Sequence, residues 1–100
     1  MDIKEEIIPQ FEHLKIIETI YLFGSRVNNP NQEKSDIDLC FVINDKSDSE
    51  SIIEIIANML TKSNLLIHPI IFEKSDFERK MKIKNYQESI IKKGRIVYSR

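Results

Sequence analysis

Residues 21–43, YLFGSRVNNPNQEKSDIDLCFVI, decide the fold of this 100-residue chain. A short apolar run ends at Gly24 and Ser25, a polar loop follows, and Asp36 and Asp38 open a second apolar run. Successive side chains of a strand point to opposite faces, so the two aspartates are predicted to share one face. Neighbouring carboxylates repel each other unless something cationic lies between them, and a divalent metal ion is the usual solution.

The Gly-Ser pair predicts a phosphate site beside these carboxylates. A strand that ends there and opens a helix presents backbone N–H groups to an anion. Gly24 lets the backbone approach a phosphate, Ser25 offers a hydroxyl donor, and Arg26 is either a triphosphate ligand or a surface cation. The plainer alternatives are a turn glycine, a helix cap and a pair of solvated carboxylates. Metal and phosphate binding together favour phosphoryl or nucleotidyl transfer.

The bulk composition excludes several classes of protein. One hundred residues with 41% hydrophobic and 31% charged side chains are predicted to form a single globular domain, 1–100. The net charge of −1 does not indicate nucleic-acid binding. The sequence has no apolar segment long enough to predict a membrane span. The lone Cys40 cannot form an internal disulfide, which favours a reducing, cytoplasmic location and a buried, inert thiol.

The rest of the chain predicts a small mixed sheet. Apolar spacing indicates helices over residues 3–17 and 52–60 and a third from residue 75, where Ser-Asp-Phe-Glu has the form of a capping box. Strands are predicted over residues 19–23, 37–43, 65–72 and 96–98. This order predicts an α/β (α+β) fold with helices packed mainly on one face of the sheet.

The combined signature resembles that of the minimal nucleotidyltransferase domains of the DNA polymerase beta superfamily. There a strand leads to Gly-Ser, a turn with Ala, Arg or Gly and a polar loop, and Ser-Asp-x-Asp-Leu enters the next strand. Here residues 24–26 and 35–39 match these parts, while Asn28 stands in place of a second cation. The resemblance implies that Asp36 and Asp38 hold the metal ion, and oxygen ligands suit Mg²⁺ or Mn²⁺. It also implies that the Gly-Ser turn contacts a nucleoside triphosphate.

Active members of that family usually carry a third carboxylate on their third strand, and this chain has none there. Residues 65–72 read LLIHPIIF, so either Leu66 or His68 takes the expected position, depending on register. His68 is a candidate substitute that could act as a base near neutral pH; the alternative is a hydrogen-bonded packing residue. Glu73 and Asp76 lie just past the strand and are weaker candidates.

The resemblance therefore predicts a metal-dependent nucleotidyltransferase. It would move a nucleoside monophosphate from a nucleoside triphosphate such as ATP to a hydroxyl acceptor, with pyrophosphate leaving. A helical HEPN-type protein is the partner that the resemblance implies, as in toxin–antitoxin pairs. The absent third acid supports two alternatives: a catalytically impaired module that binds or inhibits a helical partner, and a domain that holds nucleotide without turnover.

Overall fold

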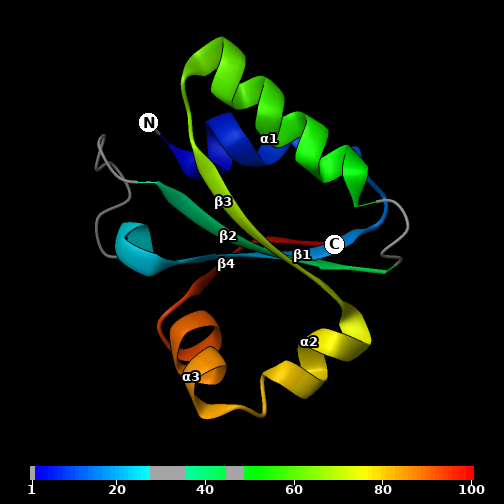
Figure 1. The fold of residues 1–100 in the computed structure, drawn as a ribbon, viewed down its shortest axis with the longest axis vertical. Helices are drawn as coiled ribbons and strands as arrows, with labels where there is room; N and C mark the ends of the chain where they lie inside the picture. The colour runs from blue at the N-terminus through cyan, green and yellow to red at the C-terminus, as the bar shows by residue number, and fades with distance from the viewer. Residues whose placement is uncertain (1, 28–35, 45–48) are drawn as a thin grey trace.

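The computed structural model describes residues 2–27, 36–44 and 49–100. Four strands and several short helices follow one another along the chain (Figure 1). The elements are η1 (Ile3–Ile7), η2 (Ile8–Gln10), β1 (Ile17–Phe23), η3 (Gly24–Val27), β2 (Ile37–Ile43), α1 (Glu50–Ser63), β3 (Ile67–Glu73), α2 (Lys74–Lys80), α3 (Lys84–Tyr86), η5 (Gln87–Lys92) and β4 (Arg95–Ser99). No helix in these described ranges is long and apolar enough to cross a membrane.

The strands form one mixed sheet in the order β3-β2-β1-β4. β1 runs antiparallel to both β2 and β4, whereas β2 and β3 are parallel. A parallel pair needs a crossover connection, and α1 supplies it by carrying the chain from the end of β2 back to the start of β3. Pro69 has no N–H to donate, and it lies in β3 at the edge of the sheet, as expected for proline.

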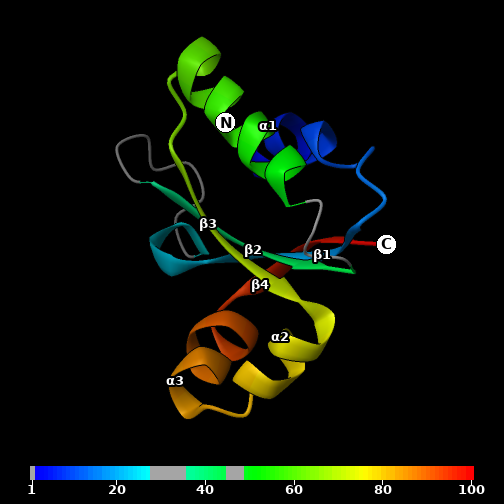
Figure 2. The same ribbon diagram turned by 45° about the vertical axis from the view of Figure 1, so that its right-hand side comes forward.

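The larger core lies between the sheet and the layer formed by η1, η2 and α1, which Figure 2 shows together on one side. Alternate residues of β1 and β2 point into it, and Phe11 of the N-terminal segment packs against Phe41 with ring centroids 5.0 Å apart. The fully buried side chains of this core are Phe11, Phe41, Ile7, Ile8, Ile17, Ile20, Leu22, Ile37, Leu39, Ile43, Ile52 and Ile67.

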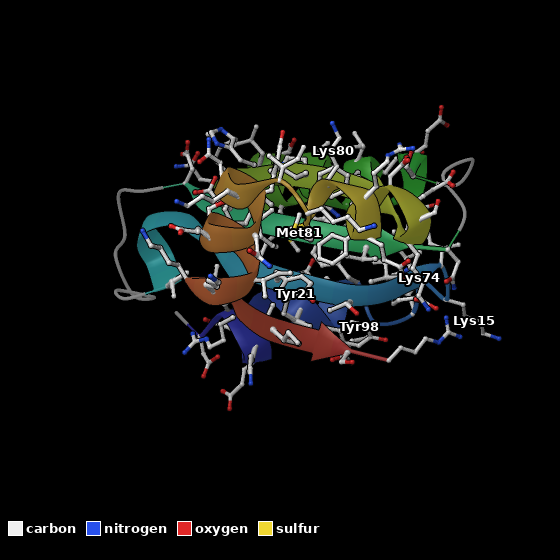
Figure 3. The ribbon with its side chains drawn as sticks, turned by 90° about the horizontal axis from the view of Figure 1, so that it is seen from below. Lys15, Tyr21, Lys74, Lys80, Met81 and Tyr98 are labelled. Carbon is white, nitrogen blue, oxygen red and sulfur yellow. The ribbon has the colours of Figure 1, made fainter. Side chains whose placement is uncertain are left out.

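Helices cover the opposite face as well, which corrects the expectation that they would pack mainly on one. Cys40 of β2 is buried there in a cluster with Met81, at the end of α2, and Ile90 of η5. Figure 3 shows the helices that cover this face, with Met81 between them and the sheet. The physical reason is that β2 is a central strand whose residues are apolar on both faces, so both faces need cover. The mixed α+β class itself is as predicted.

Two helix ends differ from the sequence expectation. The N-terminal helical segment ends at Gln10, because Pro9 interrupts its hydrogen bonding and Ile17 already belongs to β1. The predicted capping box does not form: α2 begins at Lys74, and no side chain makes a capping hydrogen bond from its N-cap position. The box needs Ser75 at the N-cap, and the observed N-cap, Glu73, lies two residues earlier, so the motif is lost.

Candidate active site

Three strands bring the predicted site residues into one row across the sheet. Asp38 of β2 pairs with Phe23 of β1 on one side and with His68 of β3 on the other. A hydrogen bond of 3.0 Å from the Ile37 N–H to the Leu66 carbonyl oxygen starts the parallel ladder. This register answers the question left open by the sequence: His68, and not Leu66, lies beside the aspartates.

The two carboxylates lie on one side of the sheet, as their spacing predicted. The Nε2 atom of His68 is 3.2 Å from Asp36 Oδ2, and its Nδ1 atom is 3.7 Å from Asp38 Oδ1. One imidazole therefore contacts both acids. The side chains of Asp36, Asp38 and His68 are 41%, 28% and 57% exposed, so a ligand from solvent can reach all three.

The environment of Asp38 disfavours its negative charge. Partial burial raises the pKa of this carboxyl above its usual value, and the neighbouring Asp36 carboxylate adds to the rise. His68 acts in the opposite direction, through its charge and through a hydrogen bond. A carboxylate in this state gains from any cation placed beside it, which is the electrostatic condition of a metal site.

Gly24 lies directly against the Asp38 carboxylate. Its φ of +78° lies in the left-handed region that other residues rarely adopt. A Cβ built on Gly24 would lie 2.3 Å from Asp38 Oδ2 and 3.1 Å from Asp38 Cγ, so a side chain there would occupy the space of the carboxylate. The backbones of Ser25 and Arg26 continue the η3 turn, whereas their side chains lie outside the described part of the structure.

The donor set of this row fits a hard divalent cation. Mg²⁺ is commonly held by one or two carboxylates, keeps several waters and completes its shell with substrate phosphates. Asp36 and Asp38 supply the carboxylates, and the space left by Gly24 opens directly onto Asp38. In the described residues no group of three or more His, Cys, Asp or Glu side chains is arranged as a complete metal site. Among the described residues, the row therefore supplies two carboxylates, the number with which Mg²⁺ is commonly held.

The other residues considered from the sequence lie elsewhere. Glu73, which was expected just past the strand, is the last residue of β3, but it pairs with Ile43 at the end of the strand far from Asp38. Asp76 forms an ion pair with Arg79 on α2. Cys40 is fully buried, as expected, and burial raises the pKa of its thiol to about 12.

The sheet order, the Gly-Ser turn and the paired aspartates together define a nucleotidyltransferase-type fold. The polymerase beta nucleotidyltransferase family model matches residues 5–100, and the chain belongs to this family. No similar sequence was found among curated proteins.

Solved structures share this fold at low sequence identity. A chain of a toxin–antitoxin complex with AMP-PNP superposes with a TM-score of 0.67 at 17% identity, covering 97% of this chain and 73% of that one. A mutant of the toxin–antitoxin MntA-HpeT gives 0.66 at 14% identity, with 97% and 73% covered. The tri-AMPylated Shewanella oneidensis HEPN toxin in complex with MNT antitoxin gives 0.61 at 15% identity, with 97% and 70% covered.

Proposed function

We propose that this chain is a metal-dependent nucleotidyltransferase that transfers the nucleoside monophosphate of ATP to a hydroxyl group of a HEPN-type helical partner. The observation that carries the proposal is the convergence of Asp36, Asp38 and His68 beside Gly24, whose missing Cβ keeps the Asp38 carboxylate accessible. Family membership supports the reaction class. The similar fold of an AMPylated HEPN toxin–MNT complex supports the nucleotide and the partner.

The residues of the row divide the chemistry between them. Asp36 and Asp38 would hold a divalent ion, which when bound neutralises phosphate charge and orients the α-phosphorus for attack. The η3 turn would donate backbone N–H groups to the phosphates. His68 would take the proton of the acceptor hydroxyl at Nδ1, the ring nitrogen with the longer contact to a carboxylate (3.7 Å), as the hydroxyl oxygen bonds to the α-phosphorus and the bond to the pyrophosphate oxygen breaks. The Asp36 carboxylate, 3.2 Å from Nε2, would then stabilise the protonated imidazole.

Label transfer tests this proposal directly. The chain is incubated with Mg²⁺ and a HEPN-type protein from the same genome, in parallel with ATP labelled at the α-phosphate and ATP labelled at the γ-phosphate. We expect label on the partner only from α-labelled ATP, and none with EDTA or with the Asp36→Asn/Asp38→Asn variant. Transfer from γ-labelled ATP would contradict nucleotidyl transfer and indicate a kinase.

A second candidate function rests on the histidine that replaces the third acid. With two carboxylates and an imidazole, the chain could bind a helical partner and nucleotide without turnover, as an inhibitory module. Pyrophosphate release separates the two functions. If the complex forms and ATP binds in a Mg²⁺-dependent way, yet neither pyrophosphate nor labelled partner is produced, the binding module is the function.

A further inference from the structure

The turn between η5 and β4 packs against the strand that leads into the Gly-Ser turn. A Cβ built on Gly94 would lie 3.0 Å from the Leu22 carbonyl oxygen and 2.1 Å from that of Ile90, so only glycine permits this close contact. Arg95 then pairs with Leu22 in the sheet. The contact with Leu22 and the pairing of Arg95 together fix the position of the turn relative to β1.

This packing brings cationic residues close to Gly24. Gly24 follows Leu22 by two residues, which is about 7 Å along an extended strand. Lys92 and Lys93 immediately precede Gly94 and end η5, which covers the same face of the sheet as Cys40 and therefore as Asp38. Figures 1 and 2 both show the end of this orange segment at the same end of the sheet as the cyan η3 turn. A flexible four-carbon stem extends the reach of each ammonium group well beyond its own backbone position.

Both lysines are available for a ligand. Their side chains are exposed, and among the described residues neither forms an ion pair with a carboxylate. A nucleoside triphosphate seated at the Gly-Ser turn would bring several negative charges there. The two aspartates would attract these charges only through a bound cation, so positive charge on the protein around the outer phosphates would strengthen binding.

We propose that Lys92 and Lys93 form the subsite for the β- and γ-phosphates of the nucleoside triphosphate. This inference rests on the proposed function, because it assumes that the triphosphate binds at the Gly-Ser turn. The sequence alone does not indicate this subsite, because the two lysines lie in a stretch rich in basic residues that is typical of a solvated helix face. Only the packing of Gly94 on Leu22 places this part of the run beside the site.

Calorimetric titration of the Lys92→Ala/Lys93→Ala variant with ATP and with AMP, each with Mg²⁺, tests the subsite. Loss of charge-assisted hydrogen bonds is expected to weaken ATP binding by about tenfold or more. AMP lacks the outer phosphates, so its affinity should change less than about twofold, which is less than the loss of one charge-assisted hydrogen bond would cause. Lys92→Arg/Lys93→Arg retains the charge and is expected to restore ATP binding.

The matched control is Lys82→Ala/Lys84→Ala, which removes the same charge from the far tip of the same helical layer. It should leave ATP affinity unchanged, and circular dichroism should confirm that all variants fold. Equal ATP affinity in the wild type and in Lys92→Ala/Lys93→Ala, with binding still lost in Asp36→Asn/Asp38→Asn, overturns the subsite alone. A wild-type chain that binds no ATP in the presence of Mg²⁺ refutes the subsite and the proposed function together.

Discussion

Replacing Gly24 by alanine should damage both the stability of the chain and its metal site, for separable reasons. The φ of +78° costs an L-residue about 1–2 kcal/mol whatever surrounds it. The new Cβ would also lie 2.3 Å from Asp38 Oδ2. Because a carboxylate at the end of a side chain can rotate away, this contact should add only about 0.5 kcal/mol, the low end of couplings between neighbouring residues. The total of about 2 kcal/mol predicts a fall in Tm of roughly 10 °C for a domain of this size.

A double-mutant cycle separates the two terms. Urea unfolding is measured for the wild type, Gly24→Ala, Asp38→Ala and the double variant, with and without Mg²⁺. In the Asp38→Ala background, Gly24→Ala should lower the free energy of unfolding only by the cost of the left-handed backbone, because the carboxylate is gone. In the wild-type background the rotated carboxylate should also lose its contact with His68, and any stabilisation by Mg²⁺ should disappear.

Two results would refute this reasoning. An unchanged free energy of unfolding in Gly24→Ala would mean that the turn does not need a left-handed residue. Retention of the full Mg²⁺-dependent stabilisation would mean that Gly24 does not lie against the metal-binding carboxylate.

Three further predictions follow from single positions. His68→Asp should lower the Kd for Mg²⁺ by about tenfold, since an added charge at a partly exposed site contributes about 1 kcal/mol or slightly more. In calorimetry, the exposed control Leu66→Asp should show no gain in Mg²⁺ affinity. Equal gains in the two variants would contradict the register of β3 against β2. The Cys40 thiol, with its pKa raised to about 12, should resist thiol reagents at pH 8 in the native state and react after unfolding in urea. The free energy of unfolding of the protein should fall as the pH rises above about 9, because the thiol ionises there in the unfolded state but not in the folded state. The Cys40→Ala variant should show a smaller fall. Asn64, which ends α1 with φ 54°, should tolerate Gly within about 0.5 kcal/mol but lose about 1 kcal/mol as Ala in thermal unfolding, and equal Tm values for the two variants would contradict the left-handed cap.

The sequence predicted the class of the fold and the shared face of Asp36 and Asp38, and it left Leu66 and His68 as the two candidates for the third position. The i, i+2 spacing of Asp36 and Asp38 was sufficient, because the alternation of a strand is a local property. The role of His68 could not be read in the same way, since Leu66 and His68 differ only in the register of β3 against β2. Register depends on the Ile37–Leu66 hydrogen bond and on the length of the α1 crossover, which are tertiary facts.

The second helical layer could have been anticipated from β2 itself. Cys40 and Val42 alternate with Leu39 and Phe41, so both faces of the strand are apolar and each needs a covering layer. The closeness of Gly94 to Leu22 had no sequence signal, because it depends on how a short helical segment meets the neighbouring strand. Whether Arg26 contacts a phosphate stays a prediction, since its side chain lies outside the described part of the structure.

The parallel pairing of β2 with β3 has a consequence for synthesis of the chain on the ribosome. Asp38 can pair with His68 only after the whole α1 crossover has emerged. Until then β2 can pair with β1 on one side, while its other hydrogen-bonding edge stays uncovered. Such an edge, apolar on both faces, can pair with another nascent chain. Because the histidine arrives on the strand that covers this edge, the same late step that protects the chain from aggregation also completes the row of site residues. Immature chains should therefore carry the two aspartates without their third neighbour.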